Sequence, residues 1–457
     1  MAGLFDSLTM AARSLQTQQY GMNVTGQNIG NVNTPGYTRR VVDLAPVPPT
    51  AGGGVEVEGV RAVRDTLLER RLLQQVPLGA RDAALADALA IVEIALGAPG
   101  EGIDADLDRF FNAFSELAQN PTSAVARREV QVAAQSLATS FNETADRLES
   151  SRRDADARIR GAVDEINALT ARIAEINAAL PNARINGSAL TLEDQQAQLV
   201  RRLSELADVN VLGREDGGVD VTIGSGRPLV IAANVYTLGT TPTPPSGYAT
   251  LTSEGSPITS EITGGTLGGL LQARDTTIPG YLTTLDTLAF QTAASVNGLH
   301  TAGFDLAGAA GGSFFSYSTA PLGSAGAARA LRVDPAIVAD NGLIAAASVA
   351  ISGDNGTARA ITALRHQRVL DGNTATLSDG WGDLVYRVGS DTQAAADSRD
   401  THDAITREVD AMRDQVSGVS LDEEALNLLK FQRAYEANAR FFTAVDDMLV
   451  TLLNSVR

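Results

Sequence analysis

An apolar stripe at the C-terminal end of the chain constrains the fold more than any other sequence feature. Ser420, with Glu423 three places later, matches a capping box, in which each side chain bonds a backbone N–H group at the start of a helix. Apolar residues then recur at alternating steps of three and four, and Glu424 and Asn438 interrupt them. The stripe consists of Leu421, Leu428, Phe431, Tyr435, Phe442, Val445, Leu449, Leu452 and Val456. Such a period predicts a helix whose apolar face meets another helix.

The first 32 residues carry a matching stripe, with polar Gln18 and Thr25 between its apolar members. It consists of Leu4, Leu8, Ala11, Leu15, Met22, Ile29 and Val32. Gly21, Gly26 and Gly30 weaken this helix, since each costs roughly 1 kcal/mol relative to Ala. Two interpretations stay open. Either the stripes pair as a terminal coiled coil into which the rest of the chain is inserted, or they are two ordinary surface helices on a globular core.

Between the two stripes the sequence pattern is mainly helical. The helical periods cover residues 62–96, 104–120, 122–180, 192–206, 266–303 and 384–416. We expect Pro77 to break or kink the first of these helices, and Pro181 with Gly187 to end the third. A periodic stretch as long as residues 122–180 is typical of a rod-like helical bundle.

Strand patterns are confined to short stretches. Residues 41–44 and 55–60 read as two strands, and residues 211–265 as a small β domain inserted between helices. Residues 305–380 are rich in Gly, Ala and Ser, and predict no definite element. The expected fold class is mainly α and elongated, with paired N- and C-terminal coiled-coil helices, a long-helix bundle and a β-rich insertion. The expected domains are a terminal coiled-coil domain (1–45 and 420–457), a mainly helical rod domain (46–210 and 266–419) and the β domain.

Composition excludes several classes of function. The formal net charge is −18, and a negative chain lacks the positive field that nucleic acids or anionic membranes require. The chain has no cysteine, hence no disulfide and no thiol nucleophile. The N-terminus lacks the pattern of a cleaved signal peptide, and no apolar run is long enough to span a bilayer. This composition fits a cytoplasmic protein, or one exported by another route.

No constellation of catalytic residues emerges from the sequence. Asp104, Asp106 and Asp108 alternate on a predicted helix and so do not converge on calcium, and helix capping explains them better. Gly224 to Arg227 resembles part of a phosphate-binding loop but lacks its Lys-Ser/Thr ending, which favours a hairpin turn. Paired arginines such as Arg39-Arg40 fit solvated faces or ion pairs in so acidic a chain. We therefore expect neither an enzyme nor a cofactor or metal site.

A turn motif follows the N-terminal helix. In Asn33-Thr34-Pro35-Gly36-Tyr37, Pro35 fixes φ near −65° and Gly36 accepts a positive φ, as a type II turn requires. The run from Asn28 to Tyr37 resembles the N-terminal signature of bacterial flagellar rod, hook and hook-associated proteins. The C-terminal runs 418–425 and 431–440 narrow the resemblance to the hook-associated family of the hook–filament junction, which Arg39 and Arg40 also fit.

The resemblance implies a structural adaptor that connects hook to filament and is needed for flagellum assembly. It implies partners: copies of the chain in a ring, the hook protein, the next junction protein, and a cytoplasmic chaperone on the C-terminal helix. It also implies localisation in the secreted flagellum after type III export without cleavage of a signal peptide. The alternatives are another axial protein, from hook or rod, or a cytoplasmic coiled-coil scaffold.

Under this resemblance the terminal stripes become subunit contacts. The expected interface residues are Leu4, Leu8, Leu15, Met22, Ile29, Val32, Leu421, Leu428, Phe431, Tyr435, Phe442, Val445, Leu449 and Leu452. In a free chain much of this apolar surface would stay wet, whereas ordering each residue costs roughly 1–2 kcal/mol. We therefore expect residues 1–45 and 420–457 to be mobile in the monomer and to fold on assembly.

Overall fold

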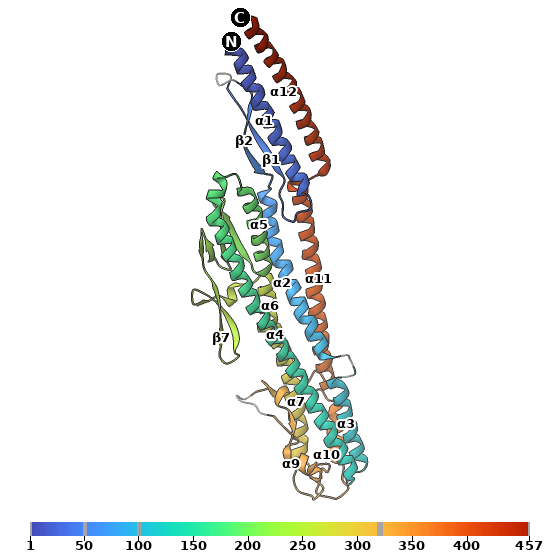
Figure 1. Ribbon diagram of the computed structural model, residues 1–457. Coiled ribbons are helices and arrows are strands. Elements are labelled where there is room, and N and C mark those ends of the chain that lie inside the picture. The colour runs from blue at the N-terminus through green and yellow to red at the C-terminus, as the bar shows by residue number, and fades with distance from the viewer. Residues whose placement is uncertain (1, 49–52, 98–99, 101, 318–322, 456–457) are drawn as a thin grey trace. The chain divides into compact units, whose positions relative to one another are not determined.

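The structure is a computed structural model that describes residues 2–48, 53–97, 100, 102–317 and 323–455. Helices make up most of it, and a short β-rich stretch interrupts them (Figure 1), which confirms the predicted mainly α fold class with a β insertion. The chain divides into two compact units. The terminal unit comprises residues 1–77, 166–237 and 402–457, and the central unit comprises residues 78–165 and 238–401. Val456, the last member of the predicted C-terminal stripe, lies outside the described residues.

The terminal unit contains both ends of the chain. Its first and last helices are α1 (Ala2–Gly30) and α12 (Leu421–Ser455). The predicted strands form an antiparallel hairpin of β1 (Arg40–Pro46) and β2 (Val55–Ala62), which packs on α1. Helix α5 (Ala189–Leu206) leads into a four-stranded antiparallel sheet. Its strands, in sheet order, are β3 (Val209–Gly213), β4 (Val219–Ile223), β5 (Arg227–Ile231) and β6 (Asn234–Val235).

The boundaries between the units fall within three long helices or next to a strand. These helices are α2 (Thr66–Leu96), α4 (Ala124–Ile185) and α11 (Leu377–Ser417). Pro77 lies inside α2, so this helix kinks at most and does not end there.

The end of α4 differs from the prediction at Pro181 and agrees with it at Gly187. The helix continues four residues past Pro181, to Ile185. Gly187 then adopts a φ of 71°, and the Ser188 N–H donates to the Ala183 carbonyl at 2.9 Å. This six-to-one hydrogen bond around a left-handed glycine is a Schellman motif, which satisfies carbonyls of the last helical turn. The glycine therefore ends the helix, and the proline only removes one hydrogen bond near its end.

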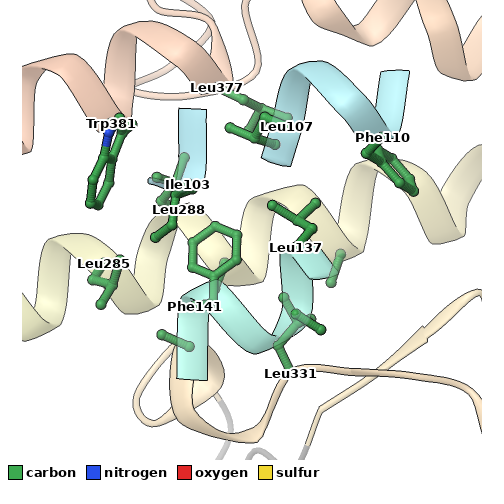
Figure 2. Packing of buried hydrophobic residues seen from close by; sticks show 14 of the residues in the cluster. Ile103, Leu107, Phe110, Leu137, Phe141, Leu285, Leu288, Leu331, Leu377 and Trp381 are labelled. Carbon is green, nitrogen blue, oxygen red and sulfur yellow. The ribbon is translucent and has the colours of Figure 1, made fainter. Parts of the chain in front are cut away.

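The central unit holds the main hydrophobic core. Helix α3 (Ile103–Gln119) buries nine of its 17 residues, against α4, α7 (Ile278–Thr301) and the start of α11. Figure 2 shows Phe141, Leu137 and Leu288 pointing into this core together with Leu107 and Trp381. The phenylalanines of α3 add edge-to-face contacts, with ring centroids of Phe110 and Phe114 5.1 Å apart.

A second, three-stranded antiparallel sheet belongs to the central unit. It consists of β7 (Leu238–Thr243), β8 (Tyr248–Ser253) and β9 (Ser256–Pro257). A buried ion pair holds it to α4: Arg274 Nη1 lies 2.6 Å from Asp156 Oδ1, and both groups also bond the backbone of Ala249. Arg274 lies in a π-helical turn, Ala273–Thr277, between α6 (Gly265–Gln272) and α7.

The described residues between 305 and 376, for which the sequence predicted no definite element, form short pieces around the core. They are β10 (Phe315–Ser316), α8 (Ala327–Ala330), β11 (Arg332–Val333), α9 (Pro335–Ala339) and α10 (Gly356–Ala363), with 3₁₀ turns at Asn341–Leu343 and Leu364–His366. Buried side chains hold these pieces. Arg127 of α4 donates to the carbonyls of Gly342 and Ile344, and His300 of α7 accepts from the Ala345 N–H at 2.8 Å.

Candidate functional site

Helices α1 and α12 lie side by side and antiparallel in the terminal unit (Figure 1). Two contacts fix their register. The Phe431 ring lies over Gly21, where a β-carbon would come within 2.5 Å of the ring. One heptad after Gly21 in α1, and one heptad before Phe431 in α12, the Asn28 amide donates to the Glu424 carboxylate at 3.1 Å. Gly21 therefore has a packing reason that outweighs its low helix propensity, since only a residue without a β-carbon leaves room for the ring.

The predicted interface residues take three different environments. Val445 and Leu449 are buried against α1, whereas Leu421 and Tyr435 are exposed. The others are half-buried, and they are Leu4, Leu8, Leu15, Met22, Ile29, Val32, Leu428, Phe431, Phe442 and Leu452. The buried side chains of α1 are instead Ala11, Thr17, Val24, Thr25 and Asn28. The two helices thus meet along an edge of each predicted stripe, and much of both stripes stays accessible.

A buried polar cluster joins the end of α1 to the start of α12. Glu424, only 2% exposed, accepts from Arg39 Nε at 2.8 Å as well as from Asn28. Asn28 uses all its hydrogen-bonding capacity: its amide nitrogen also donates to the Arg40 carbonyl, and its oxygen accepts from the Tyr37 hydroxyl and the Arg40 N–H. A buried carboxylate is stable only when it is paired and hydrogen-bonded, and this cluster supplies both conditions.

Arg39 also reaches the last residue of α11 and the first turn of α12. Its N–H donates to the Ser417 carbonyl at 2.9 Å, and its Nη1 lies 2.8 Å from Glu423. The predicted capping box is therefore realised in part. The Ser420 hydroxyl accepts from the Glu423 N–H at 3.5 Å, while the Glu423 carboxylate forms an ion pair with Arg39.

The predicted turn motif provides the bend that brings Tyr37 and Arg39 back onto α1. Gly36 has a φ of 74°, and the Tyr37 N–H donates to the Thr34 carbonyl, as a type II turn requires. Asn33, Pro35 and Gly36 are exposed, whereas Tyr37 is half-buried beneath the Arg40 guanidinium, 5.0 Å from its ring centroid. Burial raises the pKa of Tyr37, and the positive charge of Arg40 opposes that shift.

The same turn borders a cavity of about 760 Å³ within the terminal unit. Its wall combines Val32 and Leu72 with charged Arg64, Glu69 and Arg413. Burial raises the pKa of Glu69, and Arg64 and Arg413 partly offset the shift. The cavity lies against the α1–α12 cluster through the shared residues of the turn.

The sequence pattern did not reveal this cluster. Glu424 appeared as an interruption of an apolar stripe, and Arg39 as one of several paired arginines. A carboxylate on an otherwise apolar face was the available signal, because a buried charge requires a partner. What the pattern could not supply was the identity of that partner, which lies 385 residues away.

The described residues contain no group of three or more potential ligand side chains placed to bind a metal ion. Every helix in the same described ranges is too short or too polar to cross a lipid bilayer.

Comparison with known proteins identifies the family. A family model described as "Flagellar hook-associated protein FlgK helical domain" matches residues 89–315. A second, described as "Flagellar basal body rod FlgEFG protein C-terminal", matches residues 414–455, which include Glu424 and all of α12. Flagellar hook-associated protein 1 of Bacillus subtilis (strain 168) is 27% identical, and the alignment covers 100% of this chain and 99% of that protein. The protein of the same name from Escherichia coli (strain K12) is 24% identical, with 97% and 98% covered.

A solved structure agrees with these matches at the level of the fold. The flagellar hook junction protein FlgK from Burkholderia pseudomallei superposes with a TM-score of 0.69 at 18% identity, over 76% of this chain and 100% of that chain. The paired terminal helices and the matches together define the class of the chain, an axial protein of the bacterial flagellum. Within that class it belongs to the family of flagellar hook-associated protein 1.

Proposed function

We propose that the chain is a structural subunit of the hook–filament junction, where it connects the hook to the filament and is needed for flagellum assembly. The observation that carries the proposal is the incomplete burial of the terminal stripes. Of the fourteen predicted interface residues, α1 and α12 bury only Val445 and Leu449 fully against each other. Apolar side chains that a monomer leaves half-covered are suited to contacts with neighbouring subunits.

The test is the position of the protein on the organelle. Immunogold labelling of isolated flagella should mark the hook–filament boundary, and deletion of the gene should give hooks without filaments. Label along the hook or rod would favour the second candidate, another axial protein, which the match of residues 414–455 to a rod-protein family also supports. Label confined to the cytoplasm would instead indicate a coiled-coil scaffold.

We further propose that both terminal stripes contact neighbouring copies in a ring, the hook protein and the next junction protein. Fully burying a Leu, Val or Phe side chain contributes roughly 1.5–3 kcal/mol, and about half of that remains to be gained at each half-buried position.

The division into a terminal coiled-coil domain, a helical rod domain and a β domain at 211–265 stays a prediction about the assembled protein. The proposed role is structural and includes no catalysis.

Export and ordering complete the proposal. The chain would leave the cell through the flagellar type III route, with a cytoplasmic chaperone covering α12 before export. Residues 1–45 and 420–457 would be mobile in the monomer and would order on assembly. Hydrogen exchange on the purified monomer tests this: fast exchange in α1 and α12 is expected, and protection equal to that of α3 would contradict it.

A further inference from the structure

A group of exposed apolar side chains gathers on the loops of the central unit, far along the sequence from both terminal stripes. We define the loop patch as Leu306, Leu343, Val349 and Ile351; Ile351 is 67% exposed, and the other three are between 37% and 47% exposed. Backbone contacts bring them together. The Leu306 N–H donates to the Gly342 carbonyl, and the backbones of Phe304 and Ala347 exchange hydrogen bonds. Exposed large apolar residues scattered singly are ordinary, whereas a cluster of them marks an interaction surface.

The loops that carry the patch are held in place before any partner binds. Arg127, 2% exposed, donates from below to the carbonyls of Gly342 and Ile344, which flank Leu343. The Asp354 carboxylate accepts from the Ser348 hydroxyl at 2.8 Å and from the Val349 N–H at 3.3 Å. Loops fixed in this way lose little conformational entropy on binding, which favours a specific contact.

The charged side chains that the loops of the patch themselves carry are all aspartates, and the basic Arg127 beneath them is buried. Between Val333 and Arg359 the sequence contains three charged residues, Asp334, Asp340 and Asp354, whereas Asp305 in the loop that carries Leu306 is buried. Two loop patches placed face to face would bring these carboxylates together, and such like-charge pairing disfavours a symmetric contact between copies. The whole chain is acidic as well, with a formal net charge of −18, so a second copy offers few basic surfaces.

We propose that the loop patch docks a different protein of the same assembly, through apolar side chains that are flanked by arginine or lysine. The inference rests on the proposed function, because it places the partner in the flagellum. Apolar contacts with Ile351 and Val349 would supply the affinity, and the accessible aspartates of the loops, above all Asp340, would select a basic flank and reject an acidic one. The partner surface is distinct from the terminal stripes, which face like stripes of neighbouring axial helices.

The absence of cysteine from the chain makes a direct test practical. Ile351→Cys would be labelled with a maleimide-linked photocrosslinker, assembled into flagella in place of the wild-type chain, irradiated, and the joined peptides identified by mass spectrometry. Tyr386→Cys is the matched control, because Tyr386 is 76% exposed in the same unit but lies on α11, outside the patch. We expect the label at 351, and not at 386, to join a peptide of another axial protein that has Lys or Arg beside its apolar residues.

The charge requirement is tested separately with Asp340→Asn. Asp340 accepts from the Gly342 N–H, and asparagine can keep this capping bond while removing the charge. The crosslink at 351 should then weaken at low salt, and raising the salt should reduce the wild-type yield toward that of the variant. A crosslink to a second copy of this chain, no crosslink in assembled flagella, or a yield indifferent to both charge and salt would overturn the inference. If the labelled protein is not on flagella at all, the proposed function fails instead.

Discussion

Helices α3 and α12 have similar amphipathic sequence patterns, but they bury very different shares of their apolar side chains. In the 17 residues of α3, nine side chains are buried, and Phe110, Phe114 and Leu117 have no exposed surface. In α12, which is twice as long, three of the side chains that the structure describes are buried, and one of them is Glu424. The comparison teaches that an apolar stripe does not by itself say whether its partner is in the same chain. The apolar surface of α3 is satisfied by the central unit, whereas that of α12 remains largely available.

The largest expected effect concerns α3, whose apolar face is buried within the central unit. Phe110→Ala should destabilise the central unit by about 3–5 kcal/mol, since a fully buried ring is replaced by a cavity. The counterpart is Phe442→Ala in α12, where the ring is half-buried and the loss should be no more than about 1 kcal/mol. Urea unfolding of the purified monomers compares the two. Equal losses would mean that α12 is packed as firmly as α3.

The second prediction concerns the buried charge in the terminal unit. Glu424→Gln should cost about 1–3 kcal/mol, because Arg39 loses a charged acceptor in a buried setting. Glu423→Gln is the matched control: its carboxylate pairs with the same arginine but is 60% exposed, so its loss should be near zero to 1 kcal/mol. Faster amide exchange in α1 and α12 of the assembled protein, where the proposal has both helices ordered, is the expected readout for the first variant alone. Equal effects of the two variants would mean that burial of Glu424 does not strengthen its contribution to the stability of the terminal unit.

A third prediction concerns the pH dependence of the stability of the central unit, which contains His300. His300 is fully buried; its Nδ1 lies 2.7 Å from the Gly312 carbonyl, so the ring is neutral with the proton on Nδ1. Burial, with Arg127 nearby, lowers the pKa of His300 below its usual value of 6.5. The unfolded state therefore binds more protons once the pH falls below about 6.5, and folding stability drops by at most about 1.4 kcal/mol per pH unit.

Urea unfolding at pH 7.5 and 5.0 measures this loss in the central unit. The His300→Gln variant should lack this part of the pH dependence, although the variant itself is less stable. His366→Gln, at an exposed side chain, is the control and should keep the wild-type dependence. An unchanged dependence in the His300 variant would show that other groups govern the acid response.

The last prediction has the smallest expected effect on the stability of the monomer and a large expected effect on filament assembly. Leu428 is half-buried, so Leu428→Asp should cost the free chain no more than about 1 kcal/mol, yet it places a charge in the proposed subunit interface. Filament growth and motility should then be lost while the central unit unfolds normally. Thr443→Asp, on an exposed face of α12, should retain motility. Normal motility in the Leu428 variant would remove this stripe from the proposed mechanism.

Periodic features of the fold were accessible from the sequence, and contacts between distant residues were not. The terminal helices, the long helix α4 and the turn at Gly36 each follow from a local rule: a repeat, an unbroken run, or a glycine at a positive φ. The short pieces of residues 305–380 follow no such rule. Arg127 holds Gly342 from 215 residues away, and no local pattern reveals such a bond.

The candidate site divides in the same way. The stripes and the turn motif were predicted, but the Asn28–Tyr37–Arg39–Glu424 cluster was not, because its members come from two ends of the chain. The sequence named Pro181 and Gly187 together as the end of α4, and in the structure Gly187 alone ends the helix, through its Schellman motif. The cluster depends on hydrogen bonds between residues far apart in the sequence, whereas the bond that ends α4 is local.

The two contacts that set the register of α1 and α12 have a mechanical consequence. Sliding one helix along the other by a single turn, about 5.4 Å, would draw Glu424 away from Asn28 and carry the Phe431 ring off Gly21 onto bulkier neighbours. Both losses occur in the same step, and no half-slipped position satisfies either contact. Under axial tension the α1–α12 pair should therefore keep its register until both contacts break together, and it should not extend gradually.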